Sequence, residues 1–169
     1  MREISDAFLL NVAEVSATLI GLFLVGVFFY VETGFRRLGH HRDVVEPYFR
    51  SATRIVLILY ALPLILSLTL VALDLGWNRV FFALFSVMLL AANVDAVLRV
   101  RAVVKATGWT LMLVTEIAGS AAVLTLVVLP WALGGLHPSR EDLTLAILLS
   151  FATGFLSVST IVLSVFETP

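Results

Sequence analysis

Five long apolar runs, separated by short polar stretches, make up most of the chain. A helix that crosses a membrane needs about 20 mostly apolar residues, and none of these runs alternates like a strand. We therefore predict an all-α integral membrane protein, a single-domain bundle of five transmembrane helices. The predicted spans are residues 7–31, 52–73, 80–98, 109–133 and 143–166.

The composition agrees with a membrane protein. Hydrophobic residues make up 60% of the chain and charged residues only 14%, whereas charged residues are about a quarter of an ordinary soluble domain. The formal net charge of −1 gives no basic field for nucleic acid, and the absence of Cys excludes thiol catalysis and cysteine metal sites. We expect the lipid bilayer as the surroundings, and no nucleic acid and no cofactor.

A polar stripe runs along the first apolar run. Asn11, Glu14, Thr18 and Gly21 are spaced so that they share one narrow face of a helix. A charged side chain at mid-membrane costs about 2.5–3.5 kcal/mol, so Glu14 is expected to face protein, water or an ion. In an oligomer, Glu14 could form a ring of carboxylates, which is a cation-selective arrangement.

A second intramembrane carboxyl group, Glu116, lies in the fourth run. The segments 9–16 (LLNVAEVS) and 111–118 (LMLVTEIA) align on their glutamates. Three spans separate them, so they would run in opposite directions, as in the inverted repeats of transporters. The sequence thus suggests a weak inverted repeat, and the predicted ion pathway is Asn11, Glu14, Thr18 and Glu116. The alternative for either glutamate is a buried polar tie between helices.

The fifth run carries a stripe of small and hydroxyl residues. Small residues let two helix backbones approach closely, and hydroxyl groups bond across helices. We therefore predict a helix-packing face formed by Ser150, Thr153, Gly154, Ser157 and Thr160.

Basic residues are distributed unequally between the two ends of the predicted bundle. Of the 11 Lys and Arg residues, three lie at one end (Arg2, Arg79 and Arg140) and eight at the other (Arg36, Arg37, Arg42, Arg50, Arg54, Arg99, Arg101 and Lys105). The positive-inside rule places the richer end in the cytoplasm. We predict a multi-pass protein of the cell (inner) membrane, with its N-terminus outside and its C-terminus in the cytoplasm.

The only long connection, residues 32–51, is predicted to be a cytoplasmic loop in which Pro47 interrupts any helix. Asp95 and Arg99 have the spacing of an ion pair on one helix, and we place that pair at the membrane boundary. Basic side chains near the boundary attract anionic headgroups. The predicted lipid contacts are Arg36, Arg37, Arg42, Arg99, Arg101 and Lys105.

The sequence gives little support for catalysis. No H-E-x-x-H motif or Gly-rich phosphate loop occurs, and His40 and His41 match no metal-binding spacing, so we expect neither an enzyme nor a metal site. The first hypothesis is a small homo-oligomer that conducts ions or protons past intramembrane carboxylates. The alternative is a non-catalytic subunit or interaction protein of a larger membrane complex. A third, a lipid-modifying or lipid-transporting protein, rests only on the basic loop that contains His40 and His41.

Overall fold

The computed structural model describes residues 4–34, 42–107 and 110–166. These residues form five helices and no strand: α1 (Asp6–Gly34), α2 (Arg42–Ala72), α3 (Leu75–Thr107), α4 (Thr110–Gly134) and α5 (Arg140–Phe166). Each helix contains an apolar segment of 20 to 28 residues, long enough to cross a membrane. The prediction of an all-α bundle of five spanning helices is therefore confirmed, and the chain is a multi-pass membrane protein.

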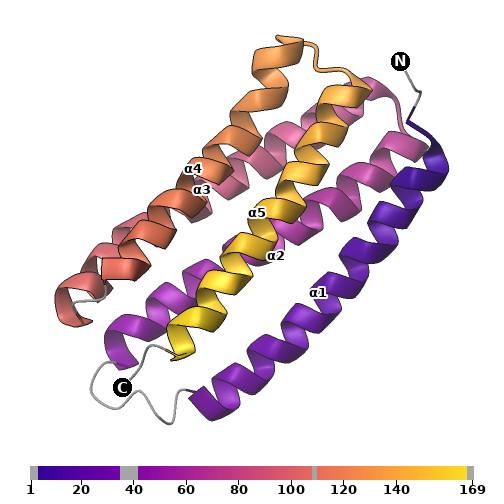
Figure 1. Cartoon of the computed structure of the whole chain (residues 1–169). Coiled ribbons are helices and arrows are strands. Elements are labelled where there is room, and N and C mark those ends of the chain that lie inside the picture. Colours follow the sequence, from indigo (N-terminus) through magenta and orange to yellow (C-terminus); the bar gives the residue numbers. More distant parts are fainter. Residues whose placement is uncertain (1–3, 35–41, 108–109, 167–169) are drawn as a thin grey trace.

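The central helix is α2, which packs against α1, α3 and α5. Because α3 also packs on α4 and α4 on α5, the last four helices form a closed ring. Helix α1 lies along the edge of the bundle and packs mainly on α2 (Figure 1). Only 17% of the most apolar stretch of α1 is buried within the chain, against 56% for α2, so most of the surface of α1 is left open.

Large apolar side chains fill the centre of the four-helix ring. Helix α2 supplies residues at helical spacing, and the other three helices each add side chains that are fully buried. This core includes Leu59, Leu62, Leu66, Phe82, Leu126, Leu143 and Ile147.

Helix α2 begins ten residues earlier than the start predicted for the second span. Residues 42–51 are helical, so the predicted loop is too long, and Pro47 lies inside the helix instead of interrupting it. A proline removes one helical hydrogen bond, here to the carbonyl of Asp43, in the second turn. Tyr48 and Phe49 are each only 6% exposed, and their packing offsets this loss. Helix α3 likewise continues past the predicted end at residue 98 to Thr107.

Candidate functional site

The polar stripe of α1 faces away from the rest of the chain. Asn11, Glu14, Thr18 and Gly21 are all exposed. The Thr18 hydroxyl donates to the backbone carbonyl of Glu14 at 3.0 Å. Within the part of the chain that the structure describes, the side chains of Asn11 and Glu14 make no hydrogen bond or ion pair. Both groups are therefore open to whatever lies beside α1 in the membrane.

The opposite face of α1 is the one that packs on the bundle. Leu9, Val12 and Ser16 are buried there, and the Ser16 hydroxyl bonds back to the carbonyl of Val12 at 2.8 Å. Glu14 is eight residues from the start of α1, about 12 Å along the helix axis at 1.5 Å per residue. This depth lies well inside the apolar segment Asp6–Phe29. The carboxyl group thus sits in the membrane layer on the side of α1 that its own chain does not cover.

Glu116 has different surroundings, because it is tied to another helix of the same chain. The Tyr48 hydroxyl of α2 donates to Oε2 of Glu116 on α4 at 2.8 Å. Tyr48 is buried, and α2 and α4 stand across the ring from each other. The structure therefore does not bring Glu14 and Glu116 together: one faces outward on α1 and the other lies between ring helices. Whether their segments form an inverted repeat stays a prediction.

A small cavity lies beside Glu116 between the ring helices. The hydroxyl of Ser120 on α4 donates to Oδ1 of the buried Asn93 on α3 at 3.1 Å. Asn93, Thr115 and Glu116 border this cavity of about 30 Å³, which is large enough for a water molecule. Apolar side chains such as Ile55 and Val123 form much of the remaining lining, so only a few polar groups face the space.

We predict that Tyr48→Phe destabilises the folded chain by about 1 kcal/mol, because interhelical hydrogen bonds in membrane proteins average about 0.6 and reach about 1.7 kcal/mol. Unfolding in detergent, followed for Tyr48→Phe, Glu116→Gln and the double variant, gives the coupling energy of the pair. A coupling energy of zero would show that the Tyr48–Glu116 bond does not hold α2 and α4 together.

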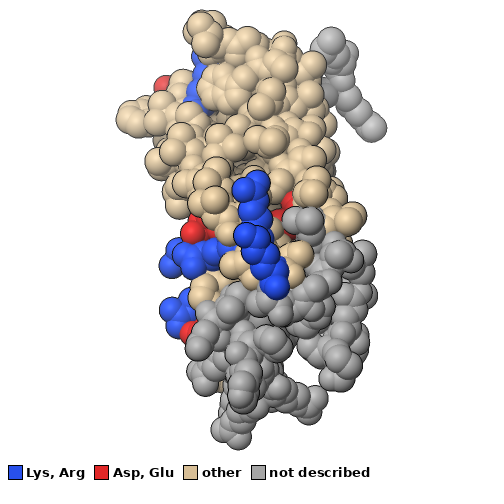
Figure 2. Space-filling model, turned by 90° about the vertical axis from the view of Figure 1, so that its left-hand side faces the viewer, with Lys and Arg blue, Asp and Glu red and all other residues tan. Residues whose placement is uncertain are grey.

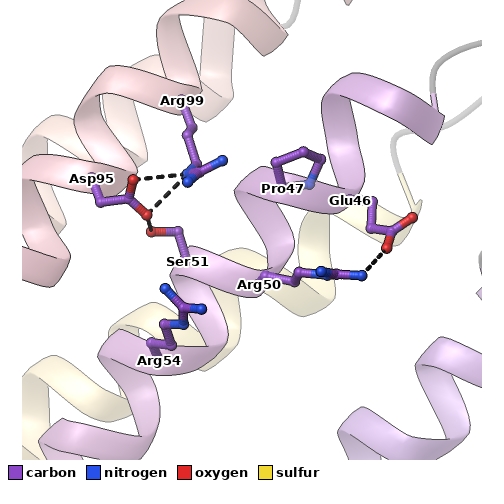
Figure 3. Close-up of a pocket in the computed structure, with 7 residues that line it drawn as sticks. All are labelled: Glu46, Pro47, Arg50, Ser51, Arg54, Asp95 and Arg99. Atoms are coloured by element: carbon purple, nitrogen blue, oxygen red, sulfur yellow. Dashed lines mark hydrogen bonds and ion pairs between the residues drawn. The ribbon is translucent and has the colours of Figure 1, made fainter.

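A charged pocket lies between α2 and α3, toward the end of the bundle where α2 begins and α3 ends (Figure 3). It has a volume of about 370 Å³, and its lining is mostly charged. The lining residues are Glu46, Pro47, Arg50, Ser51, Arg54, Asp95 and Arg99.

Both acids of this pocket are already paired. Nε of Arg99 lies 2.9 Å from both carboxylate oxygens of Asp95, which confirms the ion pair predicted from the spacing. The Ser51 hydroxyl donates to the same carboxylate at 2.6 Å, and so links α2 to α3. Arg50 pairs with Glu46 one turn away on α2. Arg50 and Ser51 were predicted to lie in the loop and Arg54 at the start of the second span, so none of the three was assigned to a site.

The predicted lipid contacts are only partly described. Arg99 lines the pocket, while Arg101 and Lys105 are exposed on the last turns of α3. Arg36 and Arg37 lie outside the described residues, as do His40 and His41, and Arg42 begins α2 with a side chain whose position is not described. Figure 2 shows several Lys and Arg side chains close together on the face in view, beside a few acids, while most of the other described atoms on this face are uncharged.

Two of the predicted packing residues of α5, Ser150 and Gly154, lie against α2. The hydroxyl of the buried Ser150 donates to the carbonyl of Leu59 at 2.5 Å, and Gly154 lies against the ring of Tyr60. Thr153 is buried and Ser157 half-buried, and both hydroxyls bond to carbonyls of α5 itself. The side chain of Thr160 lies outside the described residues.

The chain matches no family model, no curated protein and no solved structure. Its function is therefore inferred from the geometry of the two polar regions, the outer stripe of α1 and the pocket between α2 and α3. Among the described residues, no group of three or more His, Asp or Glu side chains could hold a metal ion.

Proposed function

We propose that this protein forms a homo-oligomer in the cell membrane and conducts cations or protons along a path between its copies, lined by α1. The observation that carries the proposal is the position of Glu14. It is exposed on the outer face of the most peripheral helix, inside the apolar segment, with Asn11 and Thr18 on the same face.

Contact with lipid tails is energetically unfavourable for the polar face of α1. A carboxylate in the hydrocarbon layer costs about 2.5–3.5 kcal/mol, and lipid tails offer Asn11 and Glu14 no hydrogen bonds. Another protein surface or water would remove this cost. Because α1 packs mainly on α2, the outer face is free to take up such a neighbour.

A second copy of the chain has the right chemistry to cover the stripe. The Asn11 amide both donates and accepts, and the Glu14 carboxylate accepts, so the same face can complement itself across a symmetric contact. A different partner would have to supply its own donors at the same depth.

The path is placed between copies because the interior of one chain is filled. Leu59, Leu66 and Phe82 are fully buried at the centre of the four-helix ring. In a symmetric assembly, each copy would bring one Glu14 to the common axis, and a ring of acidic side chains favours cations. In this arrangement Glu14, Asn11 and Thr18 form the conducting face. Glu116, also assigned to the pathway from the sequence, would contribute from the interior of each copy.

The orientation is part of the proposal. Arg50, Arg54, Arg99, Arg101 and Lys105 lie at the end of the bundle where α2 begins and α3 ends, whereas Arg79 and Arg140 lie at the other end. The positive-inside rule would place the first end in the cytoplasm and the beginning of α1 outside.

The second candidate function is that of a non-catalytic subunit of a larger membrane complex. The same observation favours it, since a different membrane protein could cover Glu14. Recovery of the tagged chain from native membranes separates the two: a homo-oligomer returns copies of this chain alone, and a complex returns a second membrane protein in fixed proportion.

The contact between copies is tested by cross-linking, because the chain contains no Cys and single-Cys variants are therefore free of background. Gly21→Cys lies on the proposed contact face and has no other atom within 4 Å of an added Cβ. Val87→Cys, on α3 and 65% exposed, is the matched control at a similar depth. Oxidation in native membranes is expected to link Gly21→Cys into dimers several-fold more than Val87→Cys. Equal or reversed yields would contradict a contact through α1.

A further inference from the structure

The pocket between α2 and α3 lies toward the end of the bundle where α2 begins and α3 ends. On α2 its lining extends from Glu46, the first residue of the apolar segment, to Arg54, eight residues further along. On α3 it extends from Asp95 to Arg99, three residues before Ala102, the last residue of that apolar segment. The pocket therefore begins at this end of the two segments and reaches about 12 Å along α2, at 1.5 Å per residue.

The charges of the pocket leave one arginine outside the ion pairs. Three arginines face two acids, which gives a net charge of +1. Arg50 is held by Glu46 and Arg99 by Asp95, whereas Arg54 makes no hydrogen bond or ion pair with the described residues and acts on Asp95 only through its charge. Figure 3 shows Arg54 and Arg99 reaching into the same space from facing helices, while Arg50 turns toward Glu46.

Arg99 also has hydrogen-bond donors that its pairing with Asp95 does not use. It contacts Asp95 through Nε, so its two terminal nitrogens are available for another acceptor. Asp95 fixes the position of Arg99 and, through Ser51, the spacing between the helices. The pocket thus holds two guanidinium groups ready to donate, on a frame built by the paired residues around them.

We propose that this pocket binds a phosphate group, held between Arg54 and Arg99. A guanidinium group offers several N–H donors in a planar fork that matches two oxygens of a phosphate. A phosphate has enough acceptors for both arginines at once, and its charge balances the unpaired Arg54. The phosphate belongs either to the headgroup of an anionic lipid or to a soluble phosphate ion from the aqueous side.

The test measures binding to the full-length chain in detergent with two probes, phosphatidylglycerol and inorganic phosphate. Bound lipid is counted by native mass spectrometry, and phosphate binding is followed as a rise in Tm, since a ligand that binds only the folded state stabilises it. The variant is Arg54→Gln, which removes no described hydrogen bond or ion pair and should fold like the parent. Arg79→Gln, which removes one arginine at the other end of the bundle, outside the pocket, is the control for the loss of one positive charge.

We expect Arg54→Gln to bind at least one of the two probes about tenfold more weakly, as expected for losing a charged hydrogen-bonding partner, and Arg79→Gln to stay near the parent. Arg54→Lys, which keeps the charge but loses the fork, should be intermediate. Saturable binding of phosphatidylglycerol alone identifies a lipid headgroup, and a rise in Tm with inorganic phosphate identifies a soluble ion. If the parent binds neither probe, or if Arg54→Gln and Arg79→Gln lose binding equally, the proposal is wrong.

Discussion

Gly154→Leu is expected to destabilise the folded chain by about 1–3 kcal/mol, the usual cost of overfilling a packed contact. A Cβ atom at position 154 would lie 2.7 Å from Cε1 of Tyr60, closer than real Cβ contacts allow. Tyr60 is only 2% exposed, and its ring meets Phe23 and Phe155 edge-on at centroid distances of 6.4 and 6.2 Å. The ring has little room to turn aside, so α5 would have to move away from α2.

The control for this substitution is Gly26→Leu on α1, where an added Cβ meets nothing within 4 Å. Both changes replace a helical glycine by leucine, so they share the gain in helix propensity and differ in packing. Unfolding in detergent, by heat or by denaturant, compares the two variants with the parent. If both have the same stability, then Gly154 is not the close contact between α5 and α2.

The number and position of the helices could be predicted because each apolar run is long enough to cross a membrane. The start of α2 could not be predicted in the same way. Residues 42–51 are rich in charges and contain Pro47, so hydropathy gives no signal for a helix there. Glu46, Arg50 and Arg54 nevertheless recur every four residues on one helical face. That spacing was the available sign that this segment is helical and that its charged residues line a common site.

The direction in which a polar stripe faces could not be predicted from the sequence either. Periodicity places Asn11, Glu14 and Thr18 on one face, but it does not say whether that face meets the core or the outside. Segments 9–16 and 111–118 resemble each other, yet Glu14 is exposed and Glu116 bonds to Tyr48. The difference comes from long-range packing, because α1 is at the edge of the bundle while α4 is part of the ring.

Glu14→Gln is expected to reduce cation flux by about tenfold or more, since removing the charge from an acidic ring takes away the feature that attracts cations. Glutamine has nearly the same shape, and Glu14 makes no described side-chain contact, so the free energy of unfolding should change by no more than about 0.5 kcal/mol. The matched control is Glu141→Gln, an exposed carboxyl group in the first turn of α5. This control should leave the flux unchanged, because Glu141 is at the end of the bundle.

The most direct test of a path lined by α1 is cation flux into liposomes that contain the parent chain, Glu14→Gln or Glu141→Gln, across a series of pH values. Size-exclusion chromatography would first establish that all three proteins are folded and in the same oligomeric state. We expect flux for the parent and for Glu141→Gln, and flux lower by about tenfold or more for Glu14→Gln. Flux through folded Glu14→Gln equal to that of the parent, or no flux from the folded parent, would contradict it.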